Sequence, residues 1–190
     1  WSSDVCSSDL WPFLLEKLSM LKNFGGHLVC LGLGKDEEKL RELAKEKGVA
    51  ERLIIPGTLP PEEVAGAIKG ARALIFPSLA EGFGLPVLEA MALGTPVVIA
   101  NRSPMKEIAA GCGYPFDPDW PESFNVAVKE ALADNEERTR KIEAGKKEAR
   151  KYSWRRTAHH IEDALYRAAT GKLPPNRDQE PHVLSPLTAQ

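Results

Sequence analysis

Short apolar runs alternate with segments of helical periodicity along the first two thirds of the chain. The runs have the length of buried strands, and none of them is long enough to cross a bilayer. They occupy residues 27–31, 52–55, 71–77, 96–100 and 113–116. Because nearly all-apolar strands alternate with helices, the pattern predicts an α/β fold, a parallel sheet with helices on both faces.

Helices are predicted wherever apolar residues recur three and four positions apart. The helices expected on this basis span residues 11–21, 36–47, 61–69, 85–93 and 105–109. We expect Asp36 to cap the second of these helices, Gly48 to end it, and Pro61 to start the third.

Beyond Asp119 the pattern becomes helical only. An apolar stripe through Phe124 and Val128 predicts one helix, and the charged stretch at residues 135–151 predicts a second helix with a solvated surface. Ser153 is expected to cap a last helix. The side chains expected to face inward from that helix are Ala158, Ile161, Leu165 and Ala168.

The bulk composition narrows the classes of protein. The length of 190 residues predicts one main domain, and the net charge of −2 provides no basic field that would attract nucleic acid. The three cysteines, Cys6, Cys30 and Cys112, are odd in number and widely spaced, which argues against a disulfide framework or a zinc site. A reducing, cytoplasmic setting is therefore the expectation, with Cys30 in the core.

The two ends of the chain differ from the rest. Residues 1–10, WSSDVCSSDL, repeat a Ser-Ser-Asp unit, and we interpret them as extraneous sequence at the end of a gene fragment; the alternative is a disordered natural terminus. Residues 170–190 are dominated by proline and polar residues, which predicts a disordered tail. The folded domain is expected at residues 11–169.

The stretch that points to chemistry is Glu81-Gly-Phe-Gly-Leu-Pro-Val-Leu-Glu89, which follows a predicted buried strand and opens a predicted helix. Parallel sheets bind ligands outside the carboxyl ends of their strands, where this loop is expected to lie. Gly82 and Gly84 allow the backbone to approach a ligand, and Pro86 suits the first turn of a helix. The amides and the dipole at a helix start bind anions, and a diphosphate fits this chemistry.

Two carboxylates bracket this turn. Carboxylates accept hydrogen bonds from neighbouring hydroxyls, so one of Glu81 and Glu89 could hold a sugar and the other a ribose, with the phosphates between them. The alternative is a glycine-rich turn with two solvated glutamates. The preceding strand, the Gly-x-Gly and the helix start together favour a ligand site.

The segment EGFGLPVLEAMALGTPVV resembles the E-x7-E signature of the group 1, or family 4, glycosyltransferases. The resemblance covers residues 11–169 and includes LVCLGLGKDEEKLRELAKEKGVAERLIIPGTLPPEEVAGAIKGARALIFPSLAEGFG before the signature, and NRSPMKEIAAGCGYPFDP and YSWRRTAHHIEDALYRA after it. It implies the GT-B fold, in which two Rossmann-like domains face a cleft, and this chain resembles the C-terminal, donor-binding half. The implied reaction is transfer of a hexosyl group from a nucleotide-sugar donor to a hydroxyl acceptor, with retention at the anomeric carbon.

The resemblance also implies roles for individual residues. Glu81 would be the catalytic-site residue that holds the transferred sugar, and Glu89 would accept from the ribose hydroxyls. The other implied donor-binding residues are Gly82, Phe83, Gly84 and Leu85 at the sugar and diphosphate, and Gly57 and Thr58 beside the base. Glu107 matches a glutamate expected to be structural. No metal or other cofactor is implied, because the donor is a substrate and this fold handles phosphate charge with cationic side chains and helix dipoles.

The chain departs from the family pattern at its start. The family places a central strand, and a loop with an Arg and a Lys that grip the diphosphate, before the helix that begins here at Trp11. An N-terminal domain that binds the acceptor glycan or glycolipid is absent as well. The missing first strand would lie between the strands at Leu28 and Ala73. We therefore expect the chain alone to be inactive and marginally stable or prone to aggregation.

Other functions stay open. One is a nucleotide-sugar-binding module without transferase activity, and another is an epimerase or a phosphorylase on the same scaffold. Weak peripheral association with the inner face of a membrane is a further alternative. The basic residues that would make it are Lys146, Lys147, Arg150 and Lys151.

Three further signals are explained by structure alone. Gly32-Leu-Gly34 follows a strand but lacks the third glycine of a dinucleotide fingerprint. Asp117-Pro-Asp119 is typical of a turn before a helix, so we do not interpret it as a metal site. Trp154 is expected to be a packing anchor rather than a stacking platform for a ligand.

Overall fold

The computed structural model describes residues 11–20, 25–33 and 36–172. The chain divides into two units, one up to Ala149 and the other from Arg150 onward. The expectations for residues 1–10 and for residues 173–190 of the tail lie outside the described residues, as does that for Gly34.

The first unit alternates helices and strands as the apolar pattern predicts. Its helices are α1 (Trp11–Met20), α2 (Glu37–Glu46), α3 (Pro61–Gly70), α4 (Leu85–Leu93), α5 (Met105–Ala109), α6 (Glu122–Leu132) and α7 (Glu136–Ala149), with a short 3-10 helix at Ala50–Arg52. Its strands are β1 (Leu28–Val29), β2 (Leu53–Ile54), β3 (Leu74–Phe76), β4 (Val97–Ala100) and β5 (Tyr114–Phe116). The strands are shorter than the apolar runs that predict them, because the ends of each run continue into loops.

All strand pairs are parallel, as predicted. β1 pairs with β2, while β4 lies between β3 and β5, with Val98 opposite both Ile75 and Tyr114. Among the described residues the two sheets share no hydrogen-bonded ladder. The additional strand that the family resemblance implies between Leu28 and Ala73 stays a prediction.

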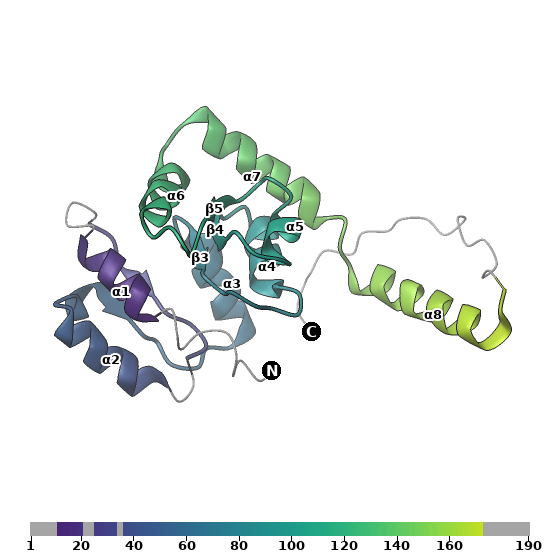
Figure 1. Ribbon diagram of the computed structural model, residues 1–190, viewed down its shortest axis with the longest axis horizontal. Coiled ribbons are helices and arrows are strands. Elements are labelled where there is room, and N and C mark those ends of the chain that lie inside the picture. Colours follow the sequence, from purple (N-terminus) through teal and green to yellow (C-terminus); the bar gives the residue numbers. More distant parts are fainter. Residues whose placement is uncertain (1–10, 21–24, 34–35, 173–190) are drawn as a thin grey trace. The chain divides into compact units, whose positions relative to one another are not determined.

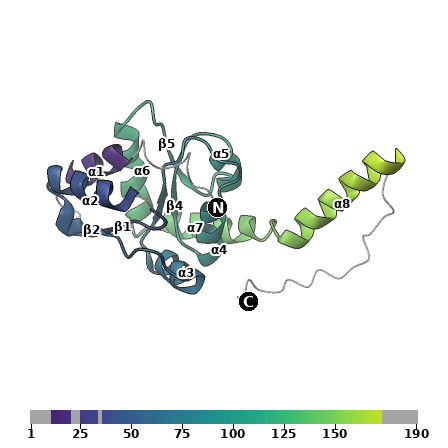
Figure 2. The same cartoon turned by 90° about the horizontal axis from the view of Figure 1, so that it is seen from below.

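The alternation of side chains along β4 divides the core of the three-stranded sheet into two layers. Val97 and Ile99 pack with side chains of α3, α4 and α5, whereas Val98 and Ala100 pack with side chains of α6 and α1. Figure 2 shows β4 and β5 between α6 and α1 on one side and α4 and α5 on the other. Helices therefore cover both faces of this sheet, as predicted.

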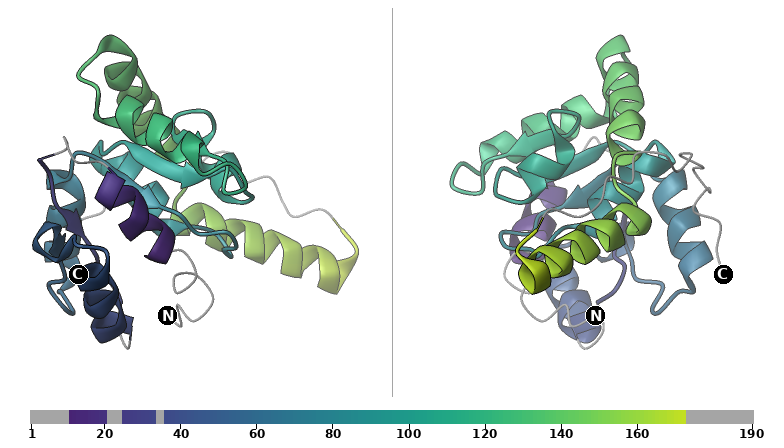
Figure 3. Two further views of the ribbon diagram at one scale, coloured as in Figure 1. Left: turned by 60° about the vertical axis from the view of Figure 1, so that its left-hand side comes forward. Right: turned by 90° about the vertical axis from the view of Figure 1, so that its right-hand side faces the viewer.

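Helix α1 contributes to two hydrophobic cores. Leu14 packs into the core formed with β4, β5 and α6, whereas Leu15 and Leu18 pack into the core of β1, β2 and α2. Figures 1 and 3 show α1 and α2 next to each other. On the face of the β1-β2 sheet opposite this core, Val29 and Ile54 keep 48% and 44% of their surface exposed. The two-stranded sheet is therefore sealed on one face and open on the other.

The start of α2 corrects one expectation. Asp36 occupies the N-cap position as predicted, but its backbone is helical and its side chain makes no capping hydrogen bond. The first turn carries Glu37 and Glu38, which favour the positive end of the helix dipole, and Glu37 accepts from Arg41 at 2.8 Å. The helix start is therefore stabilised by its first-turn carboxylates and not by its cap.

The second unit contains α8 (Trp154–Thr170), which starts as predicted because the Ser153 side chain accepts from the Arg156 amide at 3.3 Å. None of the residues of α8 is buried within this unit, and the inward-facing orientation of its apolar stripe stays a prediction. Ile161, Leu165 and Trp154 are 55%, 65% and 72% exposed. An amphipathic stripe buries itself only against another apolar surface, and residues 150–172 offer none. The helix also extends to the first residue of the predicted tail.

No helix in the described ranges combines the length and the apolar character that crossing a membrane requires.

Three phenylalanine rings join α1, β5 and α6. Phe124 meets the rings of Phe13 and Phe116 edge-on, with centroids 5.3 and 5.2 Å away. Phe124 is 2% exposed, whereas Val126 on the same helix is 53% exposed. The two residues therefore provide a buried site and an exposed control on one element.

We expect Phe124→Ala to lower the free energy of unfolding by about 3–5 kcal/mol, because it removes a buried aromatic ring and leaves a cavity. Val126→Ala should change it by less than about 0.5 kcal/mol. Urea unfolding followed by circular dichroism measures both. Equal effects of the two substitutions would show that the three rings do not form a packed core.

Candidate functional site

The loops that follow β3, β4 and β5 lie at one edge of the three-stranded sheet, because the strands are parallel. The loop after β3 carries the predicted site. It begins at Ser78, which is 2% exposed and donates to the Ala80 carbonyl at 3.1 Å. It ends at Gly84, the N-cap residue of α4. The structure thus places the Glu81 loop at the carboxyl end of a buried sheet, as predicted.

Gly84 is required by the backbone and by its neighbours. Its φ is +97°, a left-handed conformation that side-chain-bearing residues rarely adopt, and a Cβ there would lie 2.7 Å from the Met105 sulfur. Gly82 differs, since its φ lies outside the left-handed range and a Cβ there would meet no atom within 4 Å. The protein itself therefore requires glycine at position 84, whereas position 82 has room for a side chain.

The first turn of α4 restricts where an anion can bind. Pro86 lies in this turn as predicted and has no N–H, and the amides of Val87 and Leu88 donate to the Gly84 carbonyl at 3.1 and 3.4 Å. An anion at this helix start would therefore meet chiefly the amides of Gly84 and Leu85, together with the positive end of the helix dipole.

The two glutamates bracket this turn. Glu81 is half-buried in the loop, and Glu89 lies in α4 outside the buried stripe formed by Val87, Ala90 and Met91. Glu89 follows Leu85 by four residues, about 6 Å along the helix axis at the usual rise. Partial desolvation raises the pKa of the Glu89 carboxyl above its ordinary value, although the residue stays exposed as a whole. A ligand that spans the turn can therefore meet a carboxylate at each end.

The remaining predicted residues lie at two places. Phe83, beside Gly84 in the loop, is 38% exposed. Gly57 and Thr58 follow β2 on the way to α3, with a φ of +77° at Gly57 and an exposed Thr58. They lie at the carboxyl end of β2, just as the Glu81 loop lies at the carboxyl end of β3. The Glu81 loop and Gly57 thus belong to two different sheets of the first unit.

The loop after β4 contains a network that sequence reasoning missed. Arg102 pairs with Asp117 at 3.7 Å and, more closely, with Asp119. Asp117 also accepts from the Asp119 amide at 3.0 Å, so the turn chemistry predicted for this segment is present. Glu107 accepts from Ser103 at 2.8 Å, in line with a structural role. The Asp-Pro-Asp turn was visible in the sequence, but its arginine partner was not.

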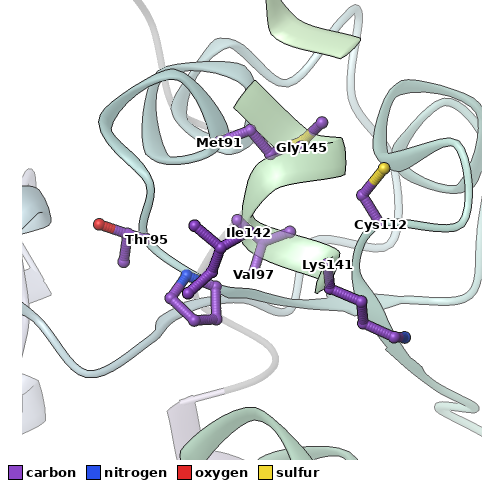
Figure 4. A pocket seen from close by; sticks show the side chains of 8 residues that line it. Met91, Thr95, Val97, Cys112, Lys141, Ile142 and Gly145 are labelled. Carbon is purple, nitrogen blue, oxygen red and sulfur yellow. The ribbon is translucent and has the colours of Figure 1, made fainter. Parts of the chain in front are cut away.

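A small cavity lies elsewhere, between α4, the start of β4 and α7. Met91, Thr95, Val97, Cys112, Lys141, Ile142 and Gly145 line it (Figure 4). The cavity is at the amino end of β4, opposite to the edge that carries the Glu81 loop. Its volume of about 10 Å³ is only enough for a single water, so it is a packing defect and not a donor site.

Metal-ligating side chains are not gathered at any point of the described ranges, where no group of three or more His, Cys, Asp or Glu is placed to hold an ion.

The fold and the loop define an α/β domain with a glycine-containing turn and a helix start at the carboxyl edge of a parallel sheet. Residues 13–148 match the family of group 1 glycosyl transferases, and the chain belongs to this family.

Two curated relatives illustrate the match. The chain is 33% identical over 122 residues to the O-antigen chain mannosyltransferase B of Escherichia coli, covering 64% of this chain and 32% of the relative. It is 34% identical over 147 residues to the D-inositol 3-phosphate glycosyltransferase of Corynebacterium urealyticum, covering 74% of this chain and 34% of the relative. The chain thus spans about a third of the length of the curated relatives it matches.

The fold is also that of solved glycosyltransferases. Superposition on the sucrose-phosphate synthase of Thermosynechococcus elongatus gives a TM-score of 0.72 at 21% identity, covering 85% of this chain and 42% of that one. The architecture is that of the C-terminal domain of a GT-B glycosyltransferase, as the sequence resemblance implies.

We expect Gly84→Ala to lower the free energy of unfolding by about 1–2 kcal/mol from the left-handed backbone alone, and further through the contact with Met105. Gly82→Ala should leave stability unchanged because its position is open. Chemical denaturation of both variants measures the difference. A stable Gly84→Ala protein would mean that the loop has another conformation.

Proposed function

We propose that the chain is the donor-binding half of a retaining glycosyltransferase that moves a hexosyl group from a nucleotide-sugar to a hydroxyl acceptor. The observation that carries the proposal is the turn between Glu81 and Glu89, with its left-handed Gly84, at the carboxyl edge of the sheet. The family membership supports glycosyl transfer, and the mannosyltransferase among its relatives supports a hexose.

In this proposal Glu81 accepts hydrogen bonds from the transferred sugar and fixes its position at the acceptor. The amides of Gly84 and Leu85 and the dipole of α4 hold the diphosphate, with Gly82 and Phe83 alongside. Glu89 accepts from the ribose hydroxyls, and Gly57 and Thr58 border the base. Each role uses a group that the geometry makes available: carboxylates at the two ends of the turn and amides at its centre.

The reaction replaces one bond at the anomeric carbon with another. The bond from that carbon to the phosphate oxygen breaks as the bond to the acceptor oxygen forms on the same face of the sugar, and the acceptor hydroxyl passes its proton to the departing diphosphate oxygen. Negative charge develops on the leaving diphosphate, where the amides and the helix dipole of α4 stabilise it. We propose that this charge is met without a metal ion. The reacting hydroxyl of the acceptor, a glycan or glycolipid, would be presented by the N-terminal domain of such an enzyme.

The first test is nucleotide binding by isothermal titration calorimetry, with the full gene product that carries this chain and with UDP, GDP and ADP. One nucleotide should bind selectively. Glu89→Ala should weaken it by about tenfold or more, because a hydrogen bond to a charged group is lost. Glu130→Ala, which removes an exposed carboxylate on α6, is the matched control. If a folded protein binds none of the three, the donor site is not functional.

Nucleotide binding without turnover would favour the alternative function, a nucleotide-sugar-binding module without transferase activity. Release of free nucleotide from the corresponding nucleotide-sugar, with and without acceptor, separates the two. A transferase releases nucleotide in proportion to the product formed, whereas a binding module releases none.

The raised pKa of Glu89 predicts how nucleotide affinity depends on pH. The carboxylate is the form that accepts from ribose hydroxyls, and a raised pKa means that this form is lost at a higher pH than for an ordinary glutamate. Affinity should therefore fall as the pH falls through that raised value. Glu89→Gln should lack this component, while protonation of the nucleotide affects both proteins alike. Parallel pH profiles of the two proteins would exclude the ribose contact.

A further inference from the structure

We infer that Trp120, with Asp119 and Arg102, forms a carbohydrate subsite for a sugar ring of the acceptor. This subsite lies beside the Glu81 loop, residues 78–84, which the proposed function makes the donor loop. The inference rests on the proposed function, because it assigns a second ligand to the same edge of the sheet. The ligand class is a hexopyranose unit of a glycan or of a glycolipid headgroup.

The first step of the argument is position. Arg102 lies in the loop after β4, and Asp119 and Trp120 lie in the turn after β5. Since the strand order is β3-β4-β5, this turn is two strands away from the strand that leads to the Glu81 loop. Two strand spacings are about 10 Å. The turn is therefore near enough to the donor loop for one glycan to reach both.

The second step is exposure. Trp120 is 60% exposed, although indole is among the side chains that gain most from burial. Of the other described residues in the loops at this edge, Leu79 and Phe83 belong to the donor loop itself and are 45% and 38% exposed. Apolar side chains thus stay open to solvent along the edge of the sheet where ligands of this fold bind.

The third step is rigidity. The Trp120 amide donates to the Asp117 carbonyl at 3.0 Å, and Ser123 donates to the Trp120 carbonyl at 2.6 Å. Ser123 also accepts from the Asp117 amide at 2.8 Å, and Arg102 binds the Asp119 carboxylate. The backbone that carries the indole is therefore held at both ends before any ligand arrives, which lowers the entropic cost of binding.

The fourth step is chemistry. One face of a hexopyranose presents C–H groups, which pack on the flat indole, while its hydroxyls point outward at the rim and need hydrogen-bond partners. Asp119, 83% exposed, offers carboxylate oxygens as acceptors, and Arg102, 38% exposed, offers N–H donors. The turn thus carries an aromatic ring and a carboxylate on consecutive residues, with the Arg102 guanidinium bound to that carboxylate. These groups match the C–H face and the hydroxyls of a sugar ring.

The test uses the full gene product labelled with 5-fluorotryptophan, whose Trp120 resonance is assigned by its loss in Trp120→Phe. Mannotriose and maltotriose are titrated in separate samples and followed by fluorine NMR. Both should shift the Trp120 signal, because stacking on C–H groups tolerates the difference between hexoses. Trp120→Ala should weaken binding by about tenfold, measured by calorimetry, and Trp120→Tyr should retain most of it. Trp154→Ala, which removes the exposed indole of α8, is the matched control and should have no effect.

A nucleotide titration of the same samples separates this inference from the proposed function. A shift of Trp120 by the sugars, with nucleotide affinity equal in wild type and Trp120→Ala, supports the subsite. Nucleotide binding with no shift of Trp120 by either sugar overturns the subsite and leaves the donor site standing. If the sugars shift the Trp120 signal but no nucleotide binds, the assignment of the subsite to the acceptor fails along with the proposed function. If neither ligand binds the folded protein, both proposals fail.

Discussion

Burial of β4 on both faces is the constraint on which the rest of the first unit depends. The side chains from Val97 to Ala100 are at most 1% exposed, and successive residues enter opposite layers of the core. A shift of the strand by one residue would exchange the two sets, so its register is strongly specified. β3 and β5 are hydrogen-bonded to this strand, and its register therefore fixes where their carboxyl ends stop. The Glu81 loop and the turn at Asp117 both begin at those ends, so their positions follow from the packing of β4.

The parts of the fold that local rules govern could be predicted from the sequence. Helix α4 has its predicted bounds because Gly84 and Gly94, at its two ends, are both left-handed, as glycine allows. The centres of the strands follow from the apolar runs. The position of the Glu81 loop follows from the general rule for parallel sheets.

The parts that depend on distant contacts could not be predicted. The pairing of Arg102 with Asp119 joins residues 17 positions apart, which no spacing rule identifies. The difference between Gly82 and Gly84 depends on Met105, which lies on another helix. An amphipathic pattern shows that α8 has an apolar face, but not what that face packs on. The residue roles at the donor site come from the family resemblance and stay predictions.

The two sheets of the first unit are supported unequally. The three-stranded sheet has helices on both faces, whereas β1 and β2 form a two-stranded sheet with one sealed face and exposed Val29 and Ile54 on the other. Two strands alone are marginally stable in water, so this part relies on α1 and α2. We expect it to open at a lower free energy than the region around β4. In a protein about three times as long, further chain would be available to cover the open face.

The close approach of Met105 to Gly84 makes the shape of the Glu81 loop depend on a side chain of the core. The methionine side chain occupies the space that a Cβ at position 84 would need, and it also belongs to the core that contains Val97 and Ile99. Methionine is the most adaptable of the large apolar side chains. Substitutions at position 105 can therefore change the shape of the Glu81 loop without altering any residue of the loop itself.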